Sequence, residues 1–145
     1  DRIPNVVLST DIIVGFPGET EEDFEDTLDV VDKVNFEQVY MFIYSRRIGT
    51  VADKMENQIP EEIKHQRFDR LKELYDSRVS KNNEKYIGTK QKLLVDGYSK
   101  NDKSMLTGRT DTNKVVVFKG SKELIGQILE VRITEEHKWY LKGEI

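Results

Sequence analysis

The 145-residue chain contains no cysteine, and this absence excludes several kinds of chemistry. Without cysteine there is no disulfide framework, no thiolate metal ligand and no thiol nucleophile. The only two histidines, His65 and His137, lie too far apart in the sequence to suggest a zinc site. No apolar run approaches the roughly 18 residues that a membrane-spanning helix needs, so we expect no contact with a membrane. Residues 1–4 do not begin a signal peptide, and no pairing of nucleophile and base is apparent.

The charged side chains are unevenly distributed. Charged residues make up 34% of the chain and hydrophobic residues 37%, which is enough for a folded core. Residues 1–87 carry 12 basic and 19 acidic side chains, a net charge of -7, whereas residues 88–145 carry 11 and 8, a net charge of +3. A basic final third beside an acidic remainder predicts two units with different partners.

The first part of the chain has the pattern of a strand, a turn, a helix and a strand. Residues 11–14 are a short apolar run without polar alternation, typical of a strand buried on both faces in a parallel sheet. The turn Gly-Phe-Pro-Gly follows at residues 15–18. Thr20 is predicted to cap a helix with three acids in its first turn, and Asp23 occupies the capping-box position. Residues 39–44 predict a second buried strand.

This β-α-β unit is incomplete by itself. Two parallel strands cannot cover both of their faces and close their edges, because parallel sheets need helices on each side and further strands. We therefore expect residues 1–45 to end a larger α/β domain that continues upstream. The missing N-terminal part of the polypeptide is then a partner of this chain, and the open sheet edge leaves a non-native oligomer as an alternative.

The rest of the chain changes pattern twice. Residues 60–87 predict a long linking helix with an imperfect apolar stripe that includes Leu71, Tyr75 and Val79. Residues 88–145 predict a small antiparallel β-barrel. Its five short strands are expected near 91–98, 104–110, 114–119, 125–133 and 138–143. The predicted divisions are thus 1–59, 60–87 and 88–145, an α/β part followed by an all-β part.

Two segments of the β-α-β unit stand where α/β folds bind ligands, at the carboxyl ends of parallel strands. They are the turn at residues 15–18 and the sequence Tyr-Ser-Arg-Arg at residues 44–47. A tight capped turn and solvated arginines are the alternatives that need no ligand. Three acids directly after the turn argue against phosphate binding.

In the predicted barrel, cations alternate with aromatic side chains. Small barrels of this size often bind RNA, with cations on the backbone and aromatic rings stacked on bases. The alternative is an ordinary charged barrel surface with Phe118 and Trp139 in the core, and for Phe118 we favour the core. The side chains concerned are Lys100, Arg109, Lys114, Lys119, Lys122 and Lys138, beside Tyr98, Phe118, Trp139 and Tyr140.

Several of these segments together resemble one enzyme family. Residues 10–20, with the sequence Thr-Asp-Ile-Ile-Val-Gly-Phe-Pro-Gly-Glu-Thr, and residues 42–45 closely resemble the radical-SAM methylthiotransferases. Residues 97–100, 106–110 and 141–144 resemble the TRAM domain that ends those enzymes. The resemblance implies the last part of a TIM-like radical-SAM barrel, a linking helix and an OB-like TRAM barrel.

Within the family, the sequence Gly-Arg-Thr-x-x-Asn-Lys-Val-Val-x-Phe from residue 108 is most like the tRNA branch. That branch adds a methylthio group to C2 of N(6)-dimethylallyladenosine next to the anticodon. The runner-up is the branch that modifies a ribosomal-protein aspartate, and a third branch acts on threonylcarbamoyl-adenosine in tRNA. A stand-alone RNA-binding module is the remaining alternative. The resemblance and the lack of an export signal imply a cytoplasmic protein.

The resemblance also implies cofactors and site residues. The complete enzyme uses S-adenosyl-L-methionine and two [4Fe–4S] clusters, whose cysteine ligands lie upstream, so we expect this chain to be inactive alone and to bind neither cluster. It contributes no catalytic residue and no metal ligand. The family usually has proline in place of Arg46, which puts the role of that residue in doubt. The implied contacts to S-adenosyl-L-methionine are Val14, Gly15, Phe16, Pro17, Phe42, Ile43 and Tyr44; those to the substrate nucleoside are Ser45 and Arg47; and those to the tRNA backbone are Lys100, Arg109, Thr110, Asn113 and Lys114.

Overall fold

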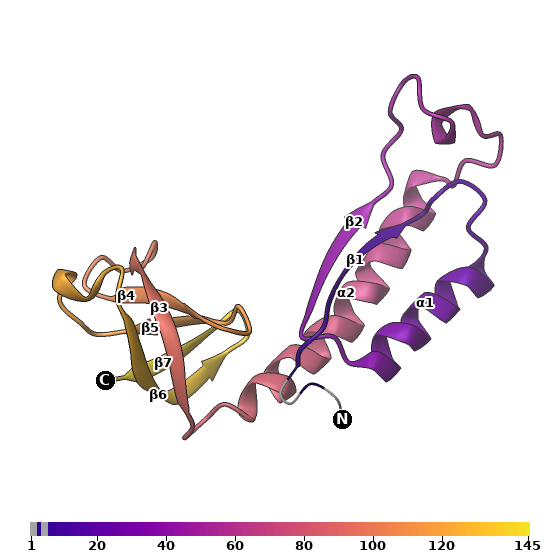
Figure 1. Ribbon diagram of the computed structural model, residues 1–145. Helices are drawn as coiled ribbons and strands as arrows, with labels where there is room; N and C mark the ends of the chain where they lie inside the picture. Colours follow the sequence, from indigo (N-terminus) through magenta and orange to yellow (C-terminus); the bar gives the residue numbers. More distant parts are fainter. Residues whose placement is uncertain (1–2, 4–5) are drawn as a thin grey trace. The chain divides into compact units, whose positions relative to one another are not determined.

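The computed structural model describes Ile3 and residues 6–145 (Figure 1). Residues 1, 2, 4 and 5, which belong to the segment with no signal-peptide pattern, lie outside the described residues. The chain contains two compact units, which we call the β-α-β unit (residues 7–78) and the barrel unit (residues 79–145). In chain order the elements are β1 (Ser9–Val14), α1 (Glu21–Val34), β2 (Gln38–Ile43), η1 (Ala52–Lys54), α2 (Glu61–Glu84), β3 (Lys90–Tyr98), β4 (Leu106–Thr110), β5 (Val115–Phe118), η2 (Lys122–Leu124), β6 (Ile128–His137) and β7 (Tyr140–Glu144).

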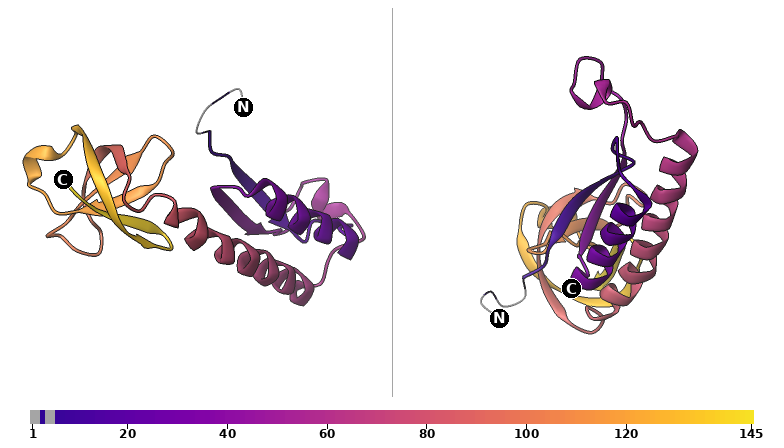
Figure 2. Two further views of the ribbon diagram at one scale, coloured as in Figure 1. Left: turned by 90° about the horizontal axis from the view of Figure 1, so that it is seen from below. Right: turned by 90° about the vertical axis from the view of Figure 1, so that its right-hand side faces the viewer.

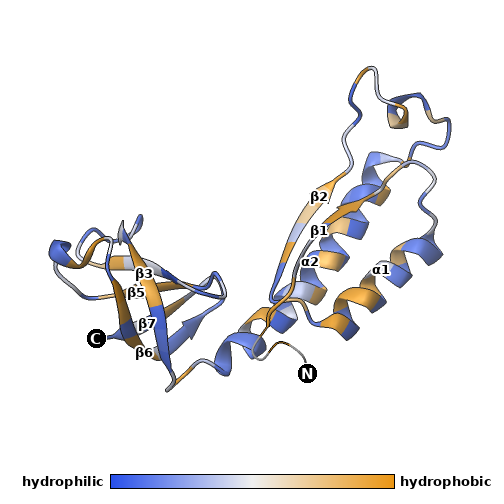
Figure 3. Cartoon of the chain, viewed as in Figure 1, coloured by the Kyte–Doolittle hydropathy of each residue, from blue (hydrophilic) through white to orange (hydrophobic). Residues whose placement is uncertain are grey.

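The two strands of the β-α-β unit pair in parallel, in register from Ser9 opposite Gln38 to Val14 opposite Ile43. One face lies against α1 and α2, which run along the same side of the pair (Figure 2). The other face is open: Ile13 is 55% exposed and Phe42 51%. The prediction that both faces are buried is therefore wrong for this chain, because nothing among the described residues covers the second face. Figure 3 shows hydrophobic residues along both strands.

Helix α1 begins as the sequence predicts. The hydroxyl of Thr20 accepts a hydrogen bond from the amide of Asp23 (3.1 Å), and the Asp23 carboxylate accepts one from the amide of Thr20 (2.8 Å). This reciprocal pair is the predicted capping box, which satisfies two amides that the helix itself leaves unpaired. Phe24 and Val31 bury the apolar side of the helix.

Helix α2 buries a stripe that is only partly apolar. Leu71, Tyr75 and Val79 are buried, as the helical spacing predicts. The same stripe continues toward the start of the helix with Lys64 and Arg67, which are 3% and 6% exposed. Two charged side chains therefore occupy positions that would ordinarily hold apolar residues.

The barrel unit is a closed five-stranded barrel in the order β3-β4-β5-β7-β6. Five strands were predicted, but the barrel is mixed rather than wholly antiparallel, because β5 and β7 pair in parallel. The reason is topological. β6 pairs antiparallel with β3, and β7 pairs antiparallel with β6. β7 lies between β6 and β5 and therefore runs in the same direction as β5.

The core of the barrel is apolar and tightly packed. Gly108 on β4 shows how tightly, because a Cβ there would lie 2.6 Å from the carbonyl oxygen of Leu94 and collide with the Leu93 side chain. Phe118 is fully buried, as predicted, whereas Trp139 is 61% exposed and outside the core. The buried cluster consists of Tyr86, Leu93, Val95, Leu106, Val116, Phe118, Val131, Ile133 and Leu141. No helix of the described residues is both long and apolar enough for a membrane crossing.

Candidate functional site

The carboxyl ends of β1 and β2 border a hollow of about 520 Å³ in the β-α-β unit, which we call the strand-end hollow. Its lining is mostly apolar and aromatic. The rings of Phe16 and Tyr44 meet edge to face, with centroids 5.3 Å apart. The Tyr44 hydroxyl is buried and has no hydrogen-bond partner among the described residues. The lining residues are Ile13, Phe16, Phe42, Ile43, Tyr44, Ser45, Arg47, Thr50 and Ala52.

A buried ion pair holds the turn beside this hollow. Gly15 has a φ of +75°, a left-handed conformation that favours glycine. Its amide donates to Glu19 Oε2 (2.8 Å). The other carboxylate oxygen of Glu19 accepts from Arg67 Nη1 (2.7 Å), and the same nitrogen donates to the Glu19 carbonyl oxygen (3.1 Å). Helix α2 thus fixes both ends of the turn through one carboxylate.

Lys64 connects the same helix to the end of β2. Its ammonium donates to the carbonyl oxygen of Tyr44 (3.1 Å), lies 5.8 Å from the centroid of the Tyr44 ring and pairs with Glu61. Its aliphatic stem occupies the space where a Cβ of Gly15 would be. Lys64, Arg67 and Glu19 were not singled out from the sequence. The available signal was the position of Lys64 and Arg67 in line with Leu71 on one face of α2.

The structure gathers part of the predicted cofactor-binding set at the strand-end hollow. Phe16, Phe42, Ile43 and Tyr44 line it, together with Ser45 and Arg47, the predicted contacts to the nucleoside. Val14, Gly15 and Pro17 are buried and do not line it. Arg46 points elsewhere and pairs with Asp53. No group of three or more metal-ligating side chains occurs in the described part of the chain.

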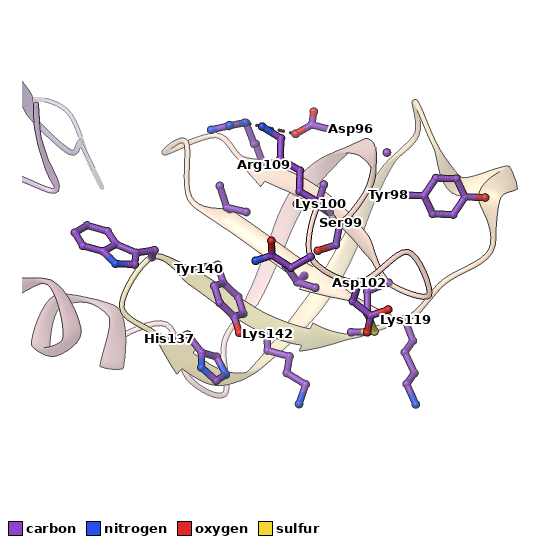
Figure 4. A pocket seen from close by; sticks show the side chains of 17 residues that line it. Asp96, Tyr98, Ser99, Lys100, Asp102, Arg109, Lys119, His137, Tyr140 and Lys142 are labelled. Carbon is purple, nitrogen blue, oxygen red and sulfur yellow. Dashed lines mark ion pairs between the residues drawn. The ribbon is translucent and has the colours of Figure 1, made fainter.

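A second, larger hollow of about 860 Å³ lies on the outside of the barrel, and we call it the barrel groove (Figure 4). The outward side chains of β4, β5 and β7 form its floor, because Thr107 and Arg109, Val115 and Val117, and Tyr140 and Lys142 alternate with core residues. The loop between β3 and β4 forms one border, and the turn between β6 and β7 forms another.

Charged side chains at the rim of the groove are held by local partners. Arg109 lies between Asp96 (3.5 Å) and the side-chain oxygen of Asn113 (2.8 Å). Lys142 donates to Glu135 (2.9 Å), which raises the pKa of the lysine and lowers that of the carboxyl. The hydroxyl and the amide of Ser104 lower the pKa of Asp102 in the same way. The side chains are thus positioned while their charges remain at the surface.

The barrel matches a known domain family. Residues 84–145 match the family model of the TRAM domain. We therefore call this segment the TRAM domain, after the family that it matches. The match begins at the last residue of α2 and includes all five strands of the barrel, so the barrel groove lies wholly within the TRAM domain.

The whole chain, including the β-α-β unit, also has close relatives. It is 52% identical over 144 residues to the tRNA-2-methylthio-N(6)-dimethylallyladenosine synthase of Clostridium beijerinckii. The aligned residues make up 99% of this chain and 32% of that protein. It is 52% identical to the synthase of the same name from Caldicellulosiruptor saccharolyticus over 145 residues, which is 31% of that protein. The chain is a relative of these synthases and spans about a third of their length.

Within the TRAM domain, the five predicted RNA contacts occupy different surroundings. Lys100 and Arg109 are exposed and line the barrel groove. Asn113 stands in a left-handed turn and holds Arg109. Thr110 is buried, and its hydroxyl accepts from the amide of Lys114 (3.0 Å). The Lys114 ammonium donates to the buried side chain of Asn83 (2.8 Å). Direct RNA contact thus remains a prediction, for which the surroundings of Lys100 and Arg109 are the most favourable.

Sequence reasoning missed the arrangement of His137 in the TRAM domain. From the sequence, His137 was considered only as a zinc ligand, whereas it ends β6, lines the barrel groove and stacks on Tyr140. The sequence pattern indicates this arrangement only weakly, because the stacking depends on which residues end the two strands of the β6–β7 hairpin. Lys119, Lys142 and Trp139 also line the groove.

Proposed function

We propose that this chain is the substrate-side part of a cytoplasmic radical-SAM tRNA methylthiotransferase, and that its TRAM domain binds tRNA through the barrel groove. The observation that carries the proposal is the relationship, over 99% of the chain, to synthases that are named for a modified adenosine of tRNA. Because the chain spans about a third of those proteins, the activity is proposed for the whole polypeptide. The substrate is then N(6)-dimethylallyladenosine beside the anticodon.

The position of the barrel groove supports the tRNA-binding role. OB-like barrels bind oligonucleotides on their second and third strands and on the loops that follow the first and fourth strands. In the TRAM domain these elements are β4 and β5, the β3–β4 loop and the β6–β7 turn, and all of them border the groove. Four basic and two acidic side chains line it, which suits a polyanion.

The strand-end hollow fits the adenosyl part of S-adenosyl-L-methionine. Its walls include Phe16 and Phe42, which offer apolar contact to a flat base, and the buried Tyr44 hydroxyl lacks a partner that a ligand would provide. When bound, S-adenosyl-L-methionine supplies the radical and methyl chemistry. In this chain the residues of the hollow bind and orient it and exclude water. Thiolate ligands for the two iron–sulfur clusters have to come from outside this chain, since it contains no cysteine.

Fluorescence anisotropy of a labelled anticodon stem-loop across a salt series tests the RNA-binding role. We expect binding that weakens steeply with salt, because phosphate contacts release counterions. The Arg109→Gln variant should bind more weakly and reduce the slope of log affinity against log salt by roughly 0.7–0.9, the loss of one phosphate contact. The matched control is Arg132→Gln, the same change at an exposed arginine of β6 that does not line the groove.

The contradicting results are equally specific. Failure of the wild-type chain to bind the stem-loop at low salt would overturn the role of the TRAM domain in binding. Equal effects of Arg109→Gln and Arg132→Gln would show that the barrel groove is not the contact surface. Preference for a ribosomal protein over the stem-loop would favour the protein-modifying branch instead.

A further inference from the structure

The end of the β6–β7 hairpin presents two stacked rings to the barrel groove. His137 and Tyr140 are the last cross-strand pair, and a two-residue turn of Lys138 and Trp139 joins them. Their rings are parallel within 8°, with centroids 4.6 Å apart. Each is only partly buried, and both line the groove.

The register of the strands places this ring pair across an aliphatic floor from a cation. Val115 lies opposite Arg109 on β4, and Val117 lies between Thr107 on β4 and Lys142 on β7. Two strand spacings, about 10 Å, therefore separate the Arg109 side of the groove from the Tyr140 side. In Figure 4, Arg109 lies on one side of the residues drawn, and His137 and Lys142 lie on the opposite side.

We propose that the His137–Tyr140 pair is a stacking platform for an unpaired base of single-stranded RNA, which makes the TRAM domain a reader of unpaired rather than duplex RNA. This rests on the proposed function and deepens it. Every base has a π-face that can continue the two-ring stack, and two cations of the same groove, Arg109 and Lys142, suit the flanking phosphates. A duplex keeps its base faces stacked on one another, so only its backbone is available to the groove.

The test uses the intact chain, a labelled single-stranded oligoadenylate and the same strand annealed to its complement. We expect the wild-type chain to favour the single strand. Tyr140→Leu should weaken single-strand binding roughly 5- to 150-fold, the range for loss of one base–aromatic stack, and should abolish the preference over duplex. Tyr140→Phe keeps the ring and should bind as the wild type does. Because the ring contacts no phosphate, the salt dependence should be the same in all three proteins.

Two further measurements remove the ambiguity of a misfolded variant or a different ring. Trp139 is the only tryptophan and adjoins Tyr140, so its emission in the wild-type chain should be quenched by the single strand and much less by the duplex. Tyr98→Leu removes another exposed ring of the same groove and should have little effect.

The outcomes separate this proposal from the proposed function. Salt-dependent RNA binding that is unaffected by Tyr140→Leu, or that leaves Trp139 emission unchanged, would overturn the platform and leave the tRNA-binding role intact. A larger loss with Tyr98→Leu than with Tyr140→Leu would overturn it as well. Absence of any RNA binding by the wild-type chain would overturn both.

Discussion

Arg67 Nη1 lies 2.7 Å from Glu19 Oε1, and the two side chains are only 7% and 13% exposed. Glu19 belongs to the turn after β1, and Arg67 lies 48 residues later on α2. The same carboxylate accepts the amide of Gly15, so a single buried ion pair connects the helix to the turn that borders the strand-end hollow.

Removal of one partner of this pair should strongly destabilise the β-α-β unit. Arg67→Met leaves the Glu19 carboxylate buried without its cation, and we expect the free energy of unfolding to fall by about 3–5 kcal/mol. Urea denaturation followed by circular dichroism measures it. Arg70→Met is the control, because Arg70 is 43% exposed, pairs with Glu21 and Glu25 at the surface and should contribute far less. Equal losses for the two variants would contradict the role given to burial.

The capping box of α1 should make the stability of the β-α-β unit depend on pH in the acidic range. Hydrogen bonds from the hydroxyl and amide of Thr20 lower the pKa of Asp23 below its ordinary 3.8. The stability that this carboxylate provides is therefore present above the ordinary pKa and is lost as the pH falls through the lower, folded-state pKa. Thr20→Val should raise the pKa of Asp23 in an NMR titration. Thr27→Val, on the same helix outside the box, is the control, and an unchanged pKa in Thr20→Val would refute the assignment.

The buried side chain of Asn83 should contribute to the stability of the barrel unit. Its amide is 2% exposed, donates to the carbonyl oxygen of Lys138 (3.2 Å) and accepts from the Lys114 ammonium. Asn83→Ala removes both hydrogen bonds from the buried interior, and we expect a loss of about 1–3 kcal/mol in the free energy of unfolding. Glu84→Ala, at the next and exposed position of α2, should change little. Thermal denaturation of the two variants that gave the same midpoint would contradict this.

The open face of the strand pair should promote self-association of this chain. Ile13, Tyr40 and Phe42 lie exposed on it, and both strands have an unpaired edge in the described structure. We expect concentration-dependent association in analytical ultracentrifugation, and Phe42→Lys should shift it toward the monomer. Val30→Lys introduces the same charge at an exposed position of α1 and should not. A wild-type chain that stays monomeric at all concentrations would rule out association through this face.

The parts of the fold that depend on neighbours in the sequence were predictable. The capping box of Thr20 and Asp23 involves residues three positions apart, and the buried residues of α2 follow helical spacing. The buried charges of Lys64 and Arg67 were not predictable, because what makes their burial favourable is contact with residues far away in the chain. Propensity and periodicity contain no information on such partners.

The candidate sites show the same division. The carboxyl ends of β1 and β2 were expected to bear a ligand site, because parallel strands place their ends together, and they border the strand-end hollow. The stack of His137 on Tyr140 depends on a two-residue turn, and the predicted strand ends were several residues away. An error of that size at a strand end is enough to hide a cross-strand pair.

The alternation along β7 ties the length of one turn to both faces of the barrel. Leu141 and Gly143 point into the core, while Tyr140 and Lys142 point into the groove. A one-residue shift in the pairing of β7 with both neighbouring strands would reverse every one of these directions, and would bury a lysine while it exposed a leucine. The register that pairs His137 with Tyr140 therefore also decides which side chains of β7 fill the core.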